Sequence, residues 1–175
     1  MYALVGNIGH IQLAQEAGLE LFGDFRLNIT NSFARHTAER LGIRTGLLSA
    51  ELTLSELRRV GGGTVVYGRI PLMLTERCFI KDSFGCDKCG KAALTDRKGA
   101  KFPMIREWGH RNIILNSVVT YMGDRQGELS SNGVSVRHFI FSTEAPAEAA
   151  EAIRSYFSGR PLSTKELRRV GRRKI

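Results

Sequence analysis

The chain has 175 residues, of which 42% are hydrophobic and 25% charged, which is typical of a globular domain long enough to bury a core. No window reaches the roughly 18 apolar residues that a membrane-spanning helix requires, and Met1 to Gly9 lacks the basic and apolar runs of a signal peptide. We therefore expect a soluble, cytoplasmic protein. Because the formal charge of +9 is largely terminal, its body is only mildly basic.

A basic tail carries most of this charge. Residues 160–175 hold seven of the 26 Lys and Arg residues and one of the 17 Asp and Glu residues. Such a segment could bind the phosphates of RNA, although a short basic terminus is also commonly just solvated. We predict a domain over residues 1–159 and a basic, flexible tail over residues 160–175.

The first seventy residues alternate short apolar runs with amphipathic stretches, as expected of consecutive strand–helix units on a parallel sheet. Strands are predicted at residues 2–5, 19–22, 45–48 and 64–67. Helices are predicted at 11–17, 30–41 and 53–60, each followed by a glycine that suits a left-handed helix end. Asn31 with Ser32, and Thr53 with Glu56, are the predicted N-terminal caps of the second and third helices.

Beyond residue 70 the pattern changes to a cysteine-rich loop over 77–91 and a predicted hairpin of strands 92–96 and 102–107. Strands at 112–115 and 136–141 and a helix at 145–157 follow. About five barrel-type strands result, whereas a β/α barrel needs eight. We therefore predict an α/β fold, a partial TIM-like barrel with an insertion over 77–107. Its partner strands would lie in an amino-terminal segment, a separate chain or a second copy; an open, doubly wound sheet is the alternative.

Polar residues follow the predicted strands, where the active site of a parallel β/α sheet lies. We assign catalysis to Asp24, Arg26, Asn28 and Arg69, and substrate binding to Asn7, Asn31, Ser49 and Glu51. The alternative for single residues is structural. Asp24 and Asn28 would then satisfy loop backbone groups, and Asn31 would cap a helix.

The cysteines have the form Cys78-x7-Cys86-x2-Cys89. The turn within a Cys-x-x-Cys pair brings both sulfurs to one centre, and soft sulfur selects zinc or iron–sulfur clusters. The open coordination position would be filled by His110, by a residue outside the chain or by substrate; inert buried thiols are the alternative. No Gly-x-Ser-x-Gly or His-Glu-x-x-His motif is present, so hydrolytic catalysis has no visible motif.

Short segments follow one another in a characteristic order. They are Val-Gly-Asn at 5–7, Gly-Asp-Phe-Arg-Leu-Asn-Ile-Thr-Asn-Ser at 23–32, Leu-Ser-Ala-Glu-Leu at 48–52 and Val-Tyr-Gly-Arg-Ile-Pro-Leu-Met at 66–73, then 94–97, 102–103 and 116–117. From about residue 4 to 143 this succession resembles the collagenase-like peptidase family U-32. The resemblance implies a β/α-barrel core with a cluster bound by cysteines near its mouth, matched here by Cys78, Cys86 and Cys89. The family's early strands and a fourth cysteine have no counterpart in this sequence.

The resemblance also implies an activity. Family members carry a peptidase or collagenase label, while relatives are implicated in oxygen-independent hydroxylation of RNA bases or of the ubiquinone ring with an iron–sulfur cluster. The leading hypothesis is therefore a modification enzyme that depends on an iron–sulfur cluster of the four-iron type, or on zinc. The alternatives are a peptidase and a zinc-stabilised RNA-binding module. The expected partners are the missing barrel half or a second copy, and RNA.

Overall fold

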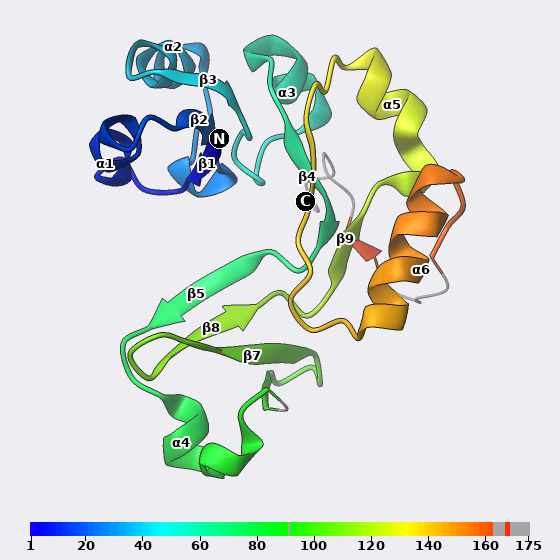
Figure 1. Ribbon diagram of the computed structural model, residues 1–175. Helices are drawn as coiled ribbons and strands as arrows, with labels where there is room; N and C mark the ends of the chain where they lie inside the picture. The colour runs from blue at the N-terminus through cyan, green and yellow to red at the C-terminus, as the bar shows by residue number, and fades with distance from the viewer. Residues whose placement is uncertain (91, 163–166, 169–175) are drawn as a thin grey trace.

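The structure is a computed structural model that describes residues 1–90, 92–162 and 167–168 (Figure 1). This mixed α/β fold begins with three parallel strands in the order β1 (Tyr2–Val5), β2 (Glu20–Gly23) and β3 (Ile43–Gly46). A parallel bridge between Leu47 and Gly63 joins the end of β3 to the start of β4 (Thr64–Gly68), and β4 pairs in parallel with β10 (Arg137–Phe139). The parallel sheet predicted for the first seventy residues is confirmed for β1 to β3, and an isolated parallel bridge links β4 to them.

Two further strands extend β4 on the side away from β10. β9 (Val119–Tyr121) is antiparallel to β4, and β11 (Leu167–Arg168) pairs in parallel with β9. β11 lies within the predicted basic tail. Residues 163–166 and 169–175 of that tail lie outside the described residues, so its flexibility stays a prediction.

The helices that accompany these strands are α1 (His10–Glu16), α2 (Ser32–Arg40), α3 (Leu54–Val60), α5 (Gln126–Ser131) and α6 (Pro146–Phe157). Thr53 and Glu56 form the predicted capping box of α3, in which Glu56 Oε2 accepts the Thr53 N–H at 2.7 Å. The glycine that follows each of α1, α2 and α3 has a positive φ, as predicted. Within the described part of the chain, no helix is both long and apolar enough to cross a membrane.

The main hydrophobic core lies between the strands and these helices. It contains Val5 from β1, Leu21 from β2, Leu57 from α3, Leu129 from α5 and Tyr156 from α6, all at most 3% exposed. Burial of an apolar side chain of this size contributes about 1.5–3 kcal/mol. One core therefore joins the helices to the strands, and Figure 1 shows α1 and α2 beside β1 to β3 and α6 beside β9.

The opposite face of the parallel strands, here called the inner face, is partly open. Tyr2 and Leu4 alternate with core residues along β1 and are 66% and 48% exposed. A hollow of about 300 Å³ on this face is lined by side chains from β1, β2 and β10. Because β1 and β10 lie at opposite ends of the strand order, a hollow that both line requires the sheet to curve. The described residues form no closed barrel.

Residues 71–115 form an antiparallel hairpin lobe. Its strand order is β5 (Pro71–Thr75), β8 (Arg111–Leu115), β7 (Lys101–Glu107) and β6 (Ala93–Thr95). The predicted hairpin is confirmed as β6 and β7. The prediction of a barrel-type strand at 112–115 is wrong, because β8 is antiparallel to both of its neighbours. Gly109 and His110, with φ of 74° and 60°, turn the chain straight back from β7, so no crossover helix can intervene.

Candidate functional site

Asp24 and Arg26 form an ion pair directly after β2. Arg26 Nη2 lies 3.0 Å from Asp24 Oδ2, and Arg26 Nε lies 3.1 Å from Asp24 Oδ1, so two N–H groups meet the carboxylate. Asp24 Oδ1 also accepts the backbone N–H of Arg26 at 2.9 Å and caps the short helix η1 (Phe25–Leu27). The side chain of Asp24 is 3% exposed and that of Arg26 61% exposed. The pair therefore presents its guanidinium, rather than its carboxylate, to a ligand.

Arg26 lies against the backbone of Gly6, just beyond β1. A Cβ atom at residue 6 would lie 2.8 Å from Arg26 Nε, so a larger side chain there would displace the guanidinium from its present position. The hydrogen bond to Asp24 raises the pKa of Arg26, and the charges of Asp24 and Glu107 add to this effect. Glu107 is the last residue of β7. The hairpin lobe therefore contributes a charge to the same edge of the parallel strands.

His138 is a candidate functional residue that the sequence patterns did not single out. It lies on β10 opposite Val65 of β4 and lines the inner-face hollow. Burial lowers its pKa, while the charge of Asp24 acts to raise this pKa and that of Arg26 to lower it further. Both ions of the pair are thus close enough to act on the imidazole. Strand alternation, which places residues 136 and 138 on one face, was the available signal.

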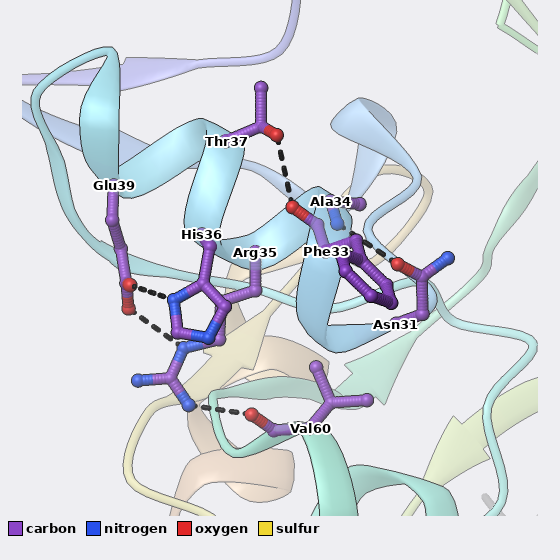
Figure 2. A network of polar contacts seen from close by, with 8 residues as sticks. All are labelled: Asn31, Phe33, Ala34, Arg35, His36, Thr37, Glu39 and Val60. Atoms are coloured by element: carbon purple, nitrogen blue, oxygen red, sulfur yellow. Dashed lines mark hydrogen bonds and ion pairs between the residues drawn. The ribbon is translucent and has the colours of Figure 1, made fainter.

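Asn31 has the capping role that the sequence left open for it, whereas Asn28 takes part in the turn through its backbone. Asn31 accepts the Ala34 N–H at 2.9 Å and so caps α2, as the dashed line in Figure 2 marks. Asn28 ends η1 in a left-handed conformation, with a φ of 53°, and its N–H donates to the Phe25 carbonyl. Their assigned parts in catalysis and substrate binding stay predictions.

Polar contacts on α2 hold this helix against α3. Arg35 donates to Glu39 Oε1 at 2.8 Å and to the carbonyl of Val60, the last residue of α3, at 2.5 Å. His36 Nδ1 lies 3.1 Å from the second oxygen of Glu39 (Figure 2). The hydrogen bond from Arg35 lowers the pKa of Glu39. The network thereby fixes the helices that follow β2 and β3, and with them the loops that carry the predicted site residues.

Asn7, Ser49 and Glu51 lie in the loops after β1 and β3. Asn7 Oδ1 accepts the Gly9 N–H at 2.8 Å. Ser49 is buried, its N–H donates to the Ile29 carbonyl at 2.9 Å, and its Oγ lies 3.4 Å from the backbone nitrogen of Glu51. Ser49 therefore joins the loops that follow β2 and β3, whereas the Glu51 side chain is exposed.

Arg69 lies between β4 and the hairpin lobe. Its Nη1 donates to the carbonyls of Asn116 at 2.8 Å and Ser117 at 2.5 Å, which follow β8. These bonds tie together the two connections into and out of the lobe. Arg69 also lines a hollow of about 520 Å³ with Tyr67 and the start of α6. The contacts of Arg69 therefore point to an anchoring role, and its assigned part in catalysis stays a prediction.

Tyr67 is a buried phenol in this second hollow. Its hydroxyl donates to Glu144 Oε1 at 3.3 Å. Burial, followed by the negative charge of Glu144, raises the pKa of Tyr67 to about 12. Because the folded pKa exceeds the unfolded value of about 10, the unfolded chain loses this proton first as the pH rises.

We therefore expect the stability of the fold to decrease between pH 10 and 12. Below pH 10 the phenol is protonated in both states and contributes no pH dependence. Between pH 8 and pH 11.5 the native chain loses unfolding free energy through Tyr67, and Tyr67→Phe does not. The loss over this range should therefore be about 2 kcal/mol smaller in Tyr67→Phe than in the native chain. Urea titrations of both proteins at the two pH values measure this difference. Parallel losses in the two proteins would contradict the assignment.

The three cysteines lie in the hairpin lobe. Cys78 is 8% exposed and caps α4 (Phe79–Phe84), with the Lys81 N–H at 3.4 Å and Asn112 Nδ2 at 3.7 Å from its sulfur. Cys78 belongs to a small core with Ile80, Met104 and Ile114, and Cys89 packs against the same core. Cys86 is exposed at the start of the turn between them, and its carbonyl accepts the Cys89 N–H at 3.2 Å.

The donor set suits a soft metal in kind, because all three groups are free thiols. Among the described residues, no three His, Cys, Asp or Glu side chains stand close enough together to hold a metal ion. His110 lies exposed in the turn between β7 and β8. Its assigned role as a fourth ligand stays a prediction.

The site therefore has two parts, a rim with Asp24, Arg26 and His138 at the curved parallel strands and a cysteine turn in the hairpin lobe. Glu107, at the end of β7 in the lobe, acts on the charge of Arg26 at the rim. Comparison of the chain with known protein families, with curated proteins and with solved structures returned no match.

Proposed function

We propose that this chain is part of a β/α-barrel enzyme of the U-32 type that modifies its substrate with the help of a cysteine-bound centre. Cys78, Cys86 and Cys89 would hold an iron–sulfur cluster, with zinc as the alternative. A bound cluster would supply one-electron transfer. The substrate, an RNA base or a quinone-type ring, would bind at the rim around Asp24 and Arg26.

The observation that carries this proposal is the meeting of Cys78 and Cys89 at one small core. Cys78 lies before α4 and Cys89 after it, yet both pack with the same apolar residues. Cys86 precedes Cys89 by one turn, between glycines at 85 and 90 that have positive φ. Such a turn can re-aim the exposed Cys86 toward its partners at little steric cost. Neither donor to the Cys78 sulfur is a histidine, so the peptidase alternative gains no Cys–His pair among the described residues.

Metal analysis of the whole chain tests the centre. The protein is purified without oxygen, incubated with ferrous iron and sulfide, and desalted. Iron and sulfide in near-equal amounts, with visible absorption, are the expected result. If the protein holds only zinc, at one ion per chain, the site is a structural zinc site, and the proposed electron-transfer chemistry is wrong. A folded chain that retains neither metal would overturn the proposal.

We also infer that further β/α units complete the barrel at β1. Within the described residues β1 pairs only with β2, and its inner-face side chains are exposed. Open edges of parallel sheets are normally covered, because unpaired N–H and C=O groups attract other strands. Amide exchange at β1 in this chain alone should therefore be faster than at β2. Equal protection of both strands would argue against a missing neighbour.

A further inference from the structure

His138 is a partly buried imidazole for which the described residues offer no hydrogen-bond partner. Its ring lines the inner-face hollow, where the charges of Asp24 and Arg26 act on it. Because burial lowers its pKa below the ordinary value of about 6.5, the imidazole is mostly neutral at pH 7.5. A neutral imidazole has one nitrogen that accepts a hydrogen bond. Within the described part of the chain, an acceptor without a partner therefore faces the hollow.

The rest of the hollow is mainly apolar. Its walls include Tyr2 and Leu4 from β1, Phe22 from β2, and Leu47 and Val136. The rings of Tyr2 and Phe22 meet edge to face, with centroids 5.3 Å apart, and so form a continuous aromatic wall. The described residues that line the hollow include no Asp, Glu, Lys or Arg, so an ion placed inside it would lose its hydration without gaining a charged partner. The hollow therefore suits an uncharged group.

We propose that the inner-face hollow binds an uncharged, mainly apolar group of the ligand whose hydroxyl or N–H donates to His138. The inference deepens the proposed function, on which it rests only for placing the substrate at this rim. It needs neither iron nor zinc. His138 would contact the ligand directly, while the charges of Asp24 and Arg26 would influence the pKa of its ring.

Two small probes separate this hydrogen bond from simple apolar binding. Phenol carries one hydroxyl, and toluene has nearly the same shape without a donor. Each is titrated at pH 7.5 into the isotope-labelled whole chain, and affinities are taken from the amide shifts of Gly23, Gly46 and Val136. The preference for phenol over toluene should be about fivefold greater in the native chain than in His138→Phe, which keeps a ring but has no acceptor. His138→Leu replaces this variant if it does not fold.

Three results would overturn the inference. The first is a phenol-to-toluene ratio that is unchanged when His138 is replaced. The second is phenol binding that maps only to the hollow around Tyr67. The third is the absence of binding by either probe. Metal content is measured on separate samples, so loss of the cysteine centre with intact phenol binding would refute the proposed function alone.

Discussion

Gly68→Ala should destabilise the fold by roughly 3–5 kcal/mol, because the new methyl group has no space and the backbone suits only glycine. Gly68 ends β4 with a φ of +118°. A Cβ atom there would overlap the carbonyl oxygen of Ile140 and lie 2.8 Å from the Ile140 Cβ. The obstacle is mainly backbone, which cannot rotate away as a side chain can. The pairing of β4 with β10 would have to open.

Gly127→Ala is the matched control. Gly127 lies in α5, a Cβ atom added there would meet nothing within 4 Å, and its φ is not in the left-handed range. Alanine should stabilise this helix by about 0.5–1 kcal/mol. Urea unfolding of both variants and the native chain measures the contrast. If Gly68→Ala unfolds within about 1 kcal/mol of the native chain, β10 does not pack on β4 as described.

Replacement of Cys86 by serine should abolish the cysteine centre while leaving the metal-free fold intact. Cys86 is exposed, and its carbonyl rather than its sulfur makes the hydrogen bond within the turn. Cys78→Ser should also abolish the centre, although serine can still accept the Lys81 N–H at the start of α4. We therefore expect near-complete loss of bound metal in both variants. The unfolding free energy of the metal-free Cys86→Ser chain should change by less than about 0.5 kcal/mol.

Asp87→Asn is the control for this pair of variants. Asp87 lies between Cys86 and Cys89, its side chain is 72% exposed, and it contacts Lys88. The substitution removes a carboxylate from the turn but leaves every thiol in place, so the metal content should stay at the native level. Full metal retention in Cys86→Ser, or loss in Asp87→Asn, would show that the ligands have been assigned wrongly.

Local signals explain which features of the first seventy residues the sequence predicts correctly; β3 (Ile43–Gly46), by contrast, begins two residues before the predicted strand at 45–48. Thr53 with Glu56, and Asn31 at the start of α2, are contacts within four residues, so the sequence alone determines them. Strand β1 was predicted with its observed limits because the apolar run is short and ends at a glycine. The sequence therefore predicts the end of a helix or strand well where the residues that contact each other there are close in the chain.

Contacts between distant segments were not predictable. The sequence does not mark β5, because this strand opens with a proline and its apolar run, Leu72 to Leu74, shows no alternation of polar and apolar residues. The apolar run of β8 fits a parallel or an antiparallel neighbour equally well, so the sequence alone does not distinguish a barrel strand from the antiparallel strand observed. The sequence does not predict that the charge of Asp24 acts on His138, because this interaction depends on how β10 closes the curved sheet.

The most direct test of the central claim is X-ray absorption of the metal bound to the whole chain. We predict that sulfur dominates the first coordination shell of iron or zinc, with metal–thiolate distances of about 2.3 Å. This shell should lose sulfur in Cys89→Ser. A native shell made only of nitrogen and oxygen would contradict the claim that Cys78, Cys86 and Cys89 hold the centre.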